Sequence, residues 1–242
     1  MPKNISPRDV IARYETMKEI WPATDTWHFF TRKAIHDTVK LWMSASGQDG
    51  ARVLNIGSGG ADYDLAGMNL IHGDLCIRNL SAGSSTVCNA ERLPFQEATF
   101  DVAICVGSVL NYCDALVALS EIARVMKPAG TLILEFEKSD NFEFIFSKPF
   151  CANAMMVTTF YGGEKERVWV YNERYIKNLL NTLRFEIQRR RAIHTLSSAI
   201  LRVLPSQIAA KFGSWDRVIS RLPLINQFSS NVIMECKKVE GS

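Results

Sequence analysis

A cluster of glycines directly after a short apolar run is the first feature of this sequence that could bind a ligand. The apolar run 53–56 is followed by Gly57, Gly59 and Gly60. Such a run is typical of a buried parallel strand that enters a tight turn. Glycines let the backbone approach a ligand closely, and a helix after the turn offers free N–H groups at its N-terminus. Taken alone, the cluster is compatible both with a nucleotide-type site and with an ordinary strand-to-helix turn.

The next three apolar runs also end in residues that could contact a ligand. Open α/β sheets bind ligands at the carboxyl ends of their parallel strands, so we expect these residues to gather at one site. A carboxylate at this edge, such as Asp74, can accept hydrogen bonds from both hydroxyl groups of a ribose. The residues concerned are Asp74 after the run 69–74, Asn89, Ala90 and Glu91 after 84–88, and Gly107 to Tyr112 after 101–106.

Strands that end at one edge of a sheet, joined by helices, are needed to position these residues. The alternation of apolar runs with helical patterns predicts this arrangement, a parallel, doubly wound α/β sheet. Asp114 is a suitable N-cap for one of the helices, and Asn172 for another. The expected strands are 51–56, 69–74, 84–88, 101–106, 130–137, 184–193 and 231–237, and the expected helices are 6–20, 27–43, 61–67, 114–126 and 173–183.

Two segments interrupt the alternation. Residues 139–171 are rich in aromatic side chains and contain a Gly162-Gly163 turn, and 195–228 show a helical pattern with two prolines. We expect both segments, together with the N-terminal helices, to form a cap over the acceptor site. The expected organisation is one domain over 1–242, with a helical addition at 1–46, a cofactor-binding core at 47–138, and insertions at 139–171 and 195–228.

The composition indicates a soluble globular protein. Hydrophobic residues make up 47% of the 242 residues and charged residues 22%. No apolar run reaches the roughly 18 residues that a membrane span requires, and the N-terminus shows no signal-peptide core. Six scattered cysteines without a CxxC pair argue against a disulfide framework and a structural zinc site. We therefore expect a cytoplasmic protein without a metal.

Five motifs in order resemble the class I S-adenosylmethionine-dependent methyltransferases, in particular their type 11-like domain. They are VLNIGSGG, HGDL, NAERLPF, ATFDVAICVGSVLNY and LSEIARVMKPAGTLILEF, which together span about 51–137. The resemblance implies a Rossmann-like sheet of seven strands, with the last strand antiparallel and inserted beside strand five. It also implies S-adenosyl-L-methionine as cofactor and S-adenosyl-L-homocysteine as product.

The resemblance assigns roles to the residues at the strand ends. Gly57 and Gly59 let the backbone pass the methionine part of the cofactor, and Asp74 binds its ribose. Asn89 and Ala90 border the adenine. The implied cofactor-binding residues are Asn55, Gly57, Ser58, Gly59, Asp74, Leu75, Asn89, Ala90, Glu91, Cys105, Val106 and Gly107.

Three positions depart from the usual pattern of this family. An acidic residue is usual where Asn55 stands, a third glycine where Ala61 stands, and aspartate is common at the position of Asn89. Two asparagines in place of carboxylates leave fewer negative charges around a cationic cofactor. A catalytically silent binding subunit that retains the fold is therefore the alternative hypothesis.

Two other functional classes are disfavoured. The dinucleotide fingerprint GxGxxG requires a glycine where Asp62 stands, and a carboxylate there would face a pyrophosphate. For nucleic-acid methylation, Asn111-Tyr112 lacks the prolines of the Asn/Asp-Pro-Pro-Tyr signature of adenine-N6 enzymes. Arg189 to Arg191 fall in an expected strand and cannot all project to one face.

A general base is required only when the acceptor is a hydroxyl or a protonated amine. Asn111 stands where relatives often carry a histidine, so a base at that position is missing. His28 and His194 are further possibilities, although histidines with satisfied ring nitrogens are the more common case. The candidate catalytic residues at the ligand edge of the sheet are Asn111, Tyr112, Glu137 and Tyr161.

The breadth of the family favours transfer to an oxygen or nitrogen of a small-molecule or glycan- or lipid-linked biosynthetic intermediate. Residues 188–238 contain nine basic and two acidic residues, which suggests an anionic partner or a solvated rim. The insertion 195–228 carries a basic amphipathic pattern. That pattern is compatible with a helical cap over the site and with peripheral contact to an anionic membrane at its cytoplasmic face.

Overall fold

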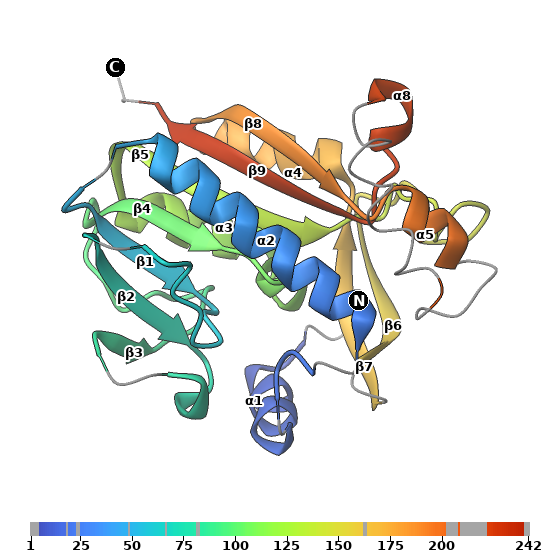
Figure 1. Cartoon of the computed structure of the whole chain (residues 1–242), viewed down its shortest axis with the longest axis horizontal. Coiled ribbons are helices and arrows are strands. Elements are labelled where there is room, and N and C mark those ends of the chain that lie inside the picture. Colours follow the sequence, from blue (N-terminus) through green and yellow to red (C-terminus); the bar gives the residue numbers. More distant parts are fainter. Residues whose placement is uncertain are drawn as a thin grey trace.

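One twisted sheet organises the chain, with helices on both of its faces (Figure 1). The computed structural model describes residues 5–17, 19–22, 25–47, 49–65, 67–80, 83–161, 164–201, 208 and 222–239. Within these residues the sheet has seven strands in the order β3-β2-β1-β4-β5-β9-β8. They are β1 (Arg52–Ile56), β2 (Asn69–Asp74), β3 (Ser85–Val87), β4 (Phe100–Cys105), β5 (Met126–Glu137), β8 (Phe185–Ile193) and β9 (Asn231–Lys238).

The pairing of the strands confirms the predicted topology. Strands β1 to β5 pair in parallel, and β9 lies between β5 and β8, antiparallel to both. The order reverses between β1 and β4, because the chain passes from β3 to the other side of β1. The ends of β1 and β4 therefore form a topological switch point, where open α/β sheets bind their ligands.

Helices bury both faces of the sheet, which explains the continuous apolar runs of its central strands. Helix α2 (Thr26–Ala45) crosses one face (Figure 1) and packs on Val53, Ile104 and Ile133. Helices α3 (Ala115–Val125) and α4 (Glu173–Thr182) pack against the other face. A strand covered on both faces reads as an unbroken hydrophobic segment rather than an alternating one.

The expected N-caps of two helices are confirmed. The Asp114 side chain accepts hydrogen bonds from the backbone N–H groups of Leu116 and Val117 at the start of α3. The Asn172 side chain accepts one from Arg174 at the start of α4. These bonds satisfy donors that have no partner within the helix.

The helix predicted at 61–67 is wrong. The described residues of this stretch form turns, in which Tyr63 and Asp64 have φ angles of 56° and 55°. Left-handed residues interrupt a right-handed helix. The carbonyl of Ala61 also accepts a hydrogen bond from Asn55 Nδ2 at 2.7 Å, so a side chain under the loop takes an acceptor that a helix would use. The connection after β1 is therefore an irregular loop.

The two insertions differ from each other. Residues 154–171 form an antiparallel hairpin of β6 (Ala154–Tyr161) and β7 (Glu164–Tyr171), which contacts α1 (Pro7–Thr16). The Gly162-Gly163 turn lies outside the described residues. Of 195–228, the structure describes α5 (Leu196–Leu201), Ile208 and 222–228 with α8 (Pro223–Asn226). The basic amphipathic pattern of that insertion thus lies largely outside the described residues.

No helix within the described residues is long and apolar enough to cross a membrane.

Candidate active site

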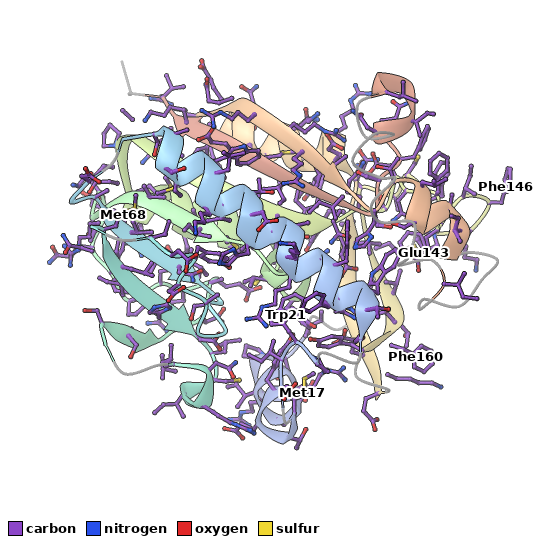
Figure 2. All side chains as sticks on the ribbon, viewed as in Figure 1. Met17, Trp21, Met68, Glu143, Phe146 and Phe160 are labelled. Atoms are coloured by element: carbon purple, nitrogen blue, oxygen red, sulfur yellow. The ribbon has the colours of Figure 1, made fainter. Side chains whose placement is uncertain are left out.

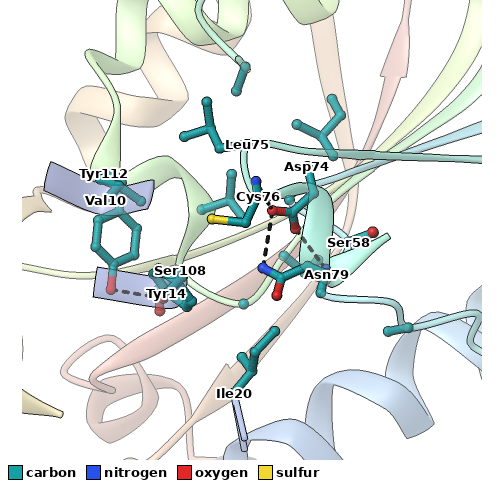
Figure 3. Close-up of a pocket in the computed structure, with 18 of the residues that line it drawn as sticks. Val10, Tyr14, Ile20, Ser58, Asp74, Leu75, Cys76, Asn79, Ser108 and Tyr112 are labelled. Carbon is teal, nitrogen blue, oxygen red and sulfur yellow. Dashed lines mark hydrogen bonds between the residues drawn. The ribbon is translucent and has the colours of Figure 1, made fainter. Parts of the chain in front are cut away.

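A cavity of about 300 Å³ opens at the carboxyl ends of β1, β2 and β4. It lies between the loops of the sheet, α1, the start of α2 and the hairpin (Figure 3). Its size falls at the lower end of the range for small-molecule sites. The cofactor-binding and catalytic candidates from the sequence that line it are Gly57, Ser58, Gly59, Asp74, Leu75, Asn89, Ala90, Glu91, Val106, Gly107, Tyr112, Glu137 and Tyr161.

Three other candidates lie outside the lining of the cavity. Asn55 is 1% exposed and lies beneath the glycine loop, where it binds the carbonyl of Ala61. Cys105 is buried within the sheet. The Asn111 amide donates to the backbone carbonyls of Glu137 and Trp169 and accepts from the N–H of Glu137. Asn55 and Asn111 thus hold the walls of the site in place instead of facing a ligand.

The carboxylate of Asp74 is anchored by the loops around it. Its Oδ2 accepts a hydrogen bond from the Gly59 N–H at 3.0 Å. Its Oδ1 accepts from the Cys76 N–H at 2.9 Å and from Asn79 Nδ2 at 3.2 Å (Figure 3). A carboxylate offers about four lone-pair positions, so one acceptor position remains for a ligand hydroxyl. The end of β2 is therefore rigid and still able to bind.

A buried glutamate holds the loop after β4. Gly107 and Ser108 have φ angles of 81° and 60°, and both of their N–H groups donate to Glu135 Oε2, at 2.8 and 2.7 Å. Asn231 Nδ2 donates to the other oxygen at 2.7 Å. Burial raises the pKa of Glu135. Backbone N–H groups that point toward one carboxylate fix the loop in an uncommon conformation, which is a typical feature of functional sites.

Glu137 faces the cavity two residues further along β5. Ser108 Oγ donates to Glu137 Oε1 at 3.0 Å. Loss of solvent, together with the neighbouring Glu135, raises the pKa of Glu137 to about 8. Glu137 is therefore protonated in most molecules at neutral pH. Among the described residues, no ion pair to Glu135 or Glu137 is found.

A chain of hydrogen bonds crosses the cavity from α1 to the hairpin. Tyr14 donates to the hydroxyl of Tyr112 at 3.1 Å (Figure 3). Tyr112 donates to Glu166 Oε2 at 2.8 Å, and Arg13 Nε lies 3.0 Å from the same oxygen. Burial raises the pKa of Tyr14 to about 12, so its phenol stays protonated at neutral pH. Tyr112 was predicted from the sequence, whereas its two partners, Tyr14 and Glu166, were not.

The two histidine candidates have different environments. His194 is fully buried, and its ring nitrogens lie 2.6 Å from Thr31 Oγ1 and 2.9 Å from Ser197 Oγ. Burial lowers its pKa to about 3, and the ring stacks on Trp27 at 3.8 Å. His194 is therefore structural. His28, by contrast, lines the cavity.

Carboxylates outnumber permanent cations among the described residues that line the cavity. Arg32 contributes a positive charge, whereas five acidic side chains face the same space, namely Asp62, Asp74, Glu91, Glu137 and Glu166. Glu137 is mostly protonated at neutral pH, and Glu166 pairs with Arg13. The remaining Asp62, Asp74 and Glu91 still outnumber Arg32, which suits a ligand with a positively charged centre.

Residues 54–134, which include the glycine loop, Asp74 and the loop after β4, match the sequence model of a methyltransferase domain. This match supports the class I S-adenosylmethionine-dependent methyltransferase family. The arrangement of its sheet, with an antiparallel strand between β5 and β8, agrees with this family. The cationic sulfonium of the family's cofactor also fits the acidic lining of the cavity.

Relatives of this methyltransferase match parts of the chain. The ubiquinone/menaquinone biosynthesis C-methyltransferase UbiE of Paraburkholderia phytofirmans is 45% identical over 53 residues, which is 22% of each chain. The enzyme of the same name from Cellvibrio japonicus is 27% identical over 179 residues, which cover 63% of this chain and 66% of that protein. The chain thus spans less than two thirds of the length of either relative.

A solved structure of the family resembles almost the whole chain. It is the 1,6-didemethyltoxoflavin-N1-methyltransferase of Burkholderia thailandensis with bound 1,6-didemethyltoxoflavin and S-adenosylhomocysteine. The TM-score is 0.57 at 15% sequence identity, and the match covers 97% of this chain and 87% of that chain. At this identity the similarity establishes the fold.

Proposed function

We propose that the protein transfers the methyl group of S-adenosylmethionine to an oxygen or nitrogen of a small-molecule or glycan- or lipid-linked biosynthetic intermediate. The observation that carries this proposal is the acidic cavity at the switch point of the sheet, bordered by the glycine loop and Asp74. When bound, the cofactor supplies a methyl group on positively charged sulfur. The chain holds its parts at Gly57–Gly59, Asp74, Asn89–Glu91 and Val106–Gly107.

The chain's own residues contribute position and environment. Displacement at a sulfonium methyl is in line, so much of the rate can come from holding the acceptor atom in near-attack geometry. The aromatic and apolar side chains of α1, the segment before α2 and the hairpin enclose the cavity opposite the strand ends. They exclude water and shape the space for an acceptor.

A second candidate function is transfer to a ring carbon of a quinol. The names of the two relatives favour it, since both are C-methyltransferases of ubiquinone and menaquinone biosynthesis. Analysis of the methylated product by NMR separates the two candidates, because a methyl group on oxygen, nitrogen or carbon has a distinct chemical shift. A catalytically silent binding subunit would yield no product with any acceptor.

Calorimetric titration with S-adenosylmethionine and S-adenosylhomocysteine tests the cofactor site. We expect the wild type to bind both ligands, and Asp74→Asn to bind each at least tenfold more weakly, a loss of about 1.4 kcal/mol or more. Asp64→Asn is the matched control, because Asp64 is an exposed residue of the loop after β1, and its carboxylate pairs with Lys40. Absence of binding to the wild type would contradict the proposal, as would equal affinities in the two variants.

A further inference from the structure

Asp25 and His28 form a pair at the start of α2, beside the cavity. Asp25 is the N-cap of the helix, and its Oδ1 accepts a hydrogen bond from the backbone N–H of His28 at 3.1 Å. Its Oδ2 lies 2.6 Å from His28 Nδ1. One carboxylate thus holds both the backbone and the ring of His28, so the orientation of the ring is fixed.

The other ring nitrogen is available to a ligand. His28 lines the cavity, and its Nε2 has no hydrogen-bond partner among the described residues. When a carboxylate accepts a hydrogen bond from Nδ1–H, Nε2 of the neutral ring is left as the proton acceptor. The pair therefore has the geometry of an oriented general base.

Aromatic rings connect His28 to the loop after β4. The Tyr161 ring lies 4.4 Å from the His28 ring, and the Trp21 ring lies 6.4 Å from it. Trp21 lies between α1 and the start of α2 (Figure 2). A Cβ on Gly107 would be 3.6 Å from Trp21 Cζ2. Trp21 thus lies beside both His28 and the loop after β4, which holds part of the cofactor in the proposed function.

The other ionisable side chains of this region are less suited to accept a proton. Burial raises the pKa of Tyr14 to about 12, and it also raises the pKa of Tyr161. Glu137 is already protonated at neutral pH because its pKa is about 8. Glu166 accepts from Tyr112 and pairs with Arg13. His28 is therefore better suited to accept a proton than these four side chains.

We propose that His28 is the general base of the reaction, that Asp25 positions it, and that the acceptor is a planar ring carrying a hydroxyl group. This inference rests on the proposed function and narrows its acceptor class. The walls formed by Trp21 and Tyr161, together with Tyr14 and Tyr112, favour a flat ring, since aromatic side chains stack on such ligands. The hydroxyl of the ring binds His28 Nε2.

His28 Nε2 takes the hydroxyl proton of the acceptor. The oxygen lone pair then forms the bond to the methyl carbon, while the carbon–sulfur bond breaks and its electron pair returns to sulfur. His28 finally releases its proton to solvent. The products are a methyl ether, a neutral thioether and a proton.

Ring NMR of the full chain with ¹⁵N-labelled histidine and saturating S-adenosylhomocysteine tests the inference directly. The chain has four histidines, and His28→Gln identifies the signal of His28. In the neutral form of the ring we expect the proton on Nδ1 and none on Nε2, because Nδ1 faces Asp25. A neutral ring with its proton on Nε2 would overturn the inference, because that nitrogen could then accept no proton.

The phenol 4-nitrophenol serves as a probe, because its phenolate absorbs visible light. We expect addition of the protein–S-adenosylhomocysteine complex to raise the phenolate fraction at least twofold at a pH below the probe's own pKa. His28→Gln should abolish this rise. His36→Gln is the matched comparison, since His36 also lines the cavity two turns further along α2, but its ring nitrogens lie 3.9 Å from Asp37 and Asp64 rather than within hydrogen-bond distance. An equal rise in His28→Gln, or none in the wild type, would contradict the inference.

Asp25→Asn tests the positioning role without removing the N-cap, because asparagine caps helices as well as aspartate does. An amide can donate to Nδ1, so we expect the ring of His28 to change to the Nε2–H tautomer in this variant. Asp37→Asn, an exposed carboxylate on the same helix, should leave the tautomer unchanged. An unchanged tautomer in Asp25→Asn would exclude the positioning role.

Failure of this inference and failure of the proposed function give different results. His28→Gln should bind S-adenosylhomocysteine within about twofold of the wild type in calorimetry. If the wild type itself does not bind the cofactor product, the proposed function fails. If it binds while His28 carries its proton on Nε2, the proposed function stands and the inference on the base is wrong.

Discussion

Gly57 and Val109 lie so close together that a Cβ on Gly57 would be 2.2 Å from Val109 Cγ2. This contact joins the loop after β1 to the loop after β4, the two segments on either side of the switch point. Gly57 also has a φ angle of 63°. Residues other than glycine adopt such an angle only at a cost in free energy. Two independent requirements thus select glycine at the first position of the cluster.

Gly57→Ala should therefore cost more than an ordinary glycine substitution. We expect a loss of about 2–4 kcal/mol in the free energy of unfolding, from the left-handed backbone and from overpacking against Val109. Gly47→Ala is the control, since Gly47 has a φ angle of 60° and nothing within 4 Å of an added Cβ. The Gly47→Ala variant should lose about 1–2 kcal/mol in the free energy of unfolding. Urea unfolding measures both, and equal losses would show that the Val109 contact is unimportant.

The protonation of Glu137 should appear in the pH dependence of stability. Its pKa is about 8 in the folded protein against a reference value of 4.5, so the folded state binds the proton more tightly than the unfolded state. The resulting stabilisation is complete below pH 4.5 and is lost as the pH rises through 8. The Glu137→Gln variant does not titrate at this position. Relative to it, the free energy of unfolding of the wild type should fall by at most a few kcal/mol between pH 5 and 9. Parallel stability curves for the two proteins would contradict this prediction.

The strands that the sequence predicted correctly rest on local signals. Asp74 and Gly57 follow apolar runs that are buried on both faces, and such runs show where strands end. The helix at 61–67 failed because its pattern did not reveal the left-handed residues or the bond from Asn55 to Ala61. Local periodicity does not record contacts of that kind.

The acceptor side of the cavity depends on contacts between distant segments. Tyr14 and Tyr112 are 98 residues apart, and Tyr112 and Glu166 are 54 apart, so their proximity appears only in the folded chain. His28 did leave a local signal, an aspartate three residues before a histidine at a helix start. In α2 this spacing lets the N-cap carboxylate reach the ring.

Helix α1 should act as a cover held by polar contacts. None of its residues is buried, and Arg13 ties it to the hairpin through Glu166 and the carbonyl of Tyr161, the latter at 2.7 Å. Arg13→Gln should speed release of S-adenosylhomocysteine about five- to tenfold, a change of about 1–1.4 kcal/mol. It should also speed amide hydrogen exchange in α1. Arg8→Gln removes an exposed arginine of the same helix and should change neither quantity. Unchanged release in Arg13→Gln would show that α1 does not retain the ligand.

A buried charge cluster beyond the site should dominate the stability of the α4–β8 region. Lys138 is fully buried, with its Nζ 2.9 Å from Glu173 Oε2. Arg190 binds both oxygens of Glu173, through Nε at 2.7 Å and Nη2 at 2.8 Å. Removing one partner of a buried pair leaves a charge uncompensated, which costs about 3–5 kcal/mol. We expect that loss in Glu173→Gln, and less than about 0.5 kcal/mol in Glu186→Gln, an exposed glutamate of β8.

The buried charge cluster around Glu173 should also make the protein less stable in acid. Burial acts to raise the pKa of Glu173, but the hydrogen bonds from Arg190 and the charge of Lys138 outweigh it and hold that pKa well below its usual value of 4.5. The stabilisation is therefore present above pH 4.5 and is lost as the pH falls through the pKa of the folded protein. The gap in unfolding free energy between the wild type and Glu173→Gln should narrow from pH 5 to pH 3. A constant gap over this range would show that Glu173 does not carry the stabilising charge.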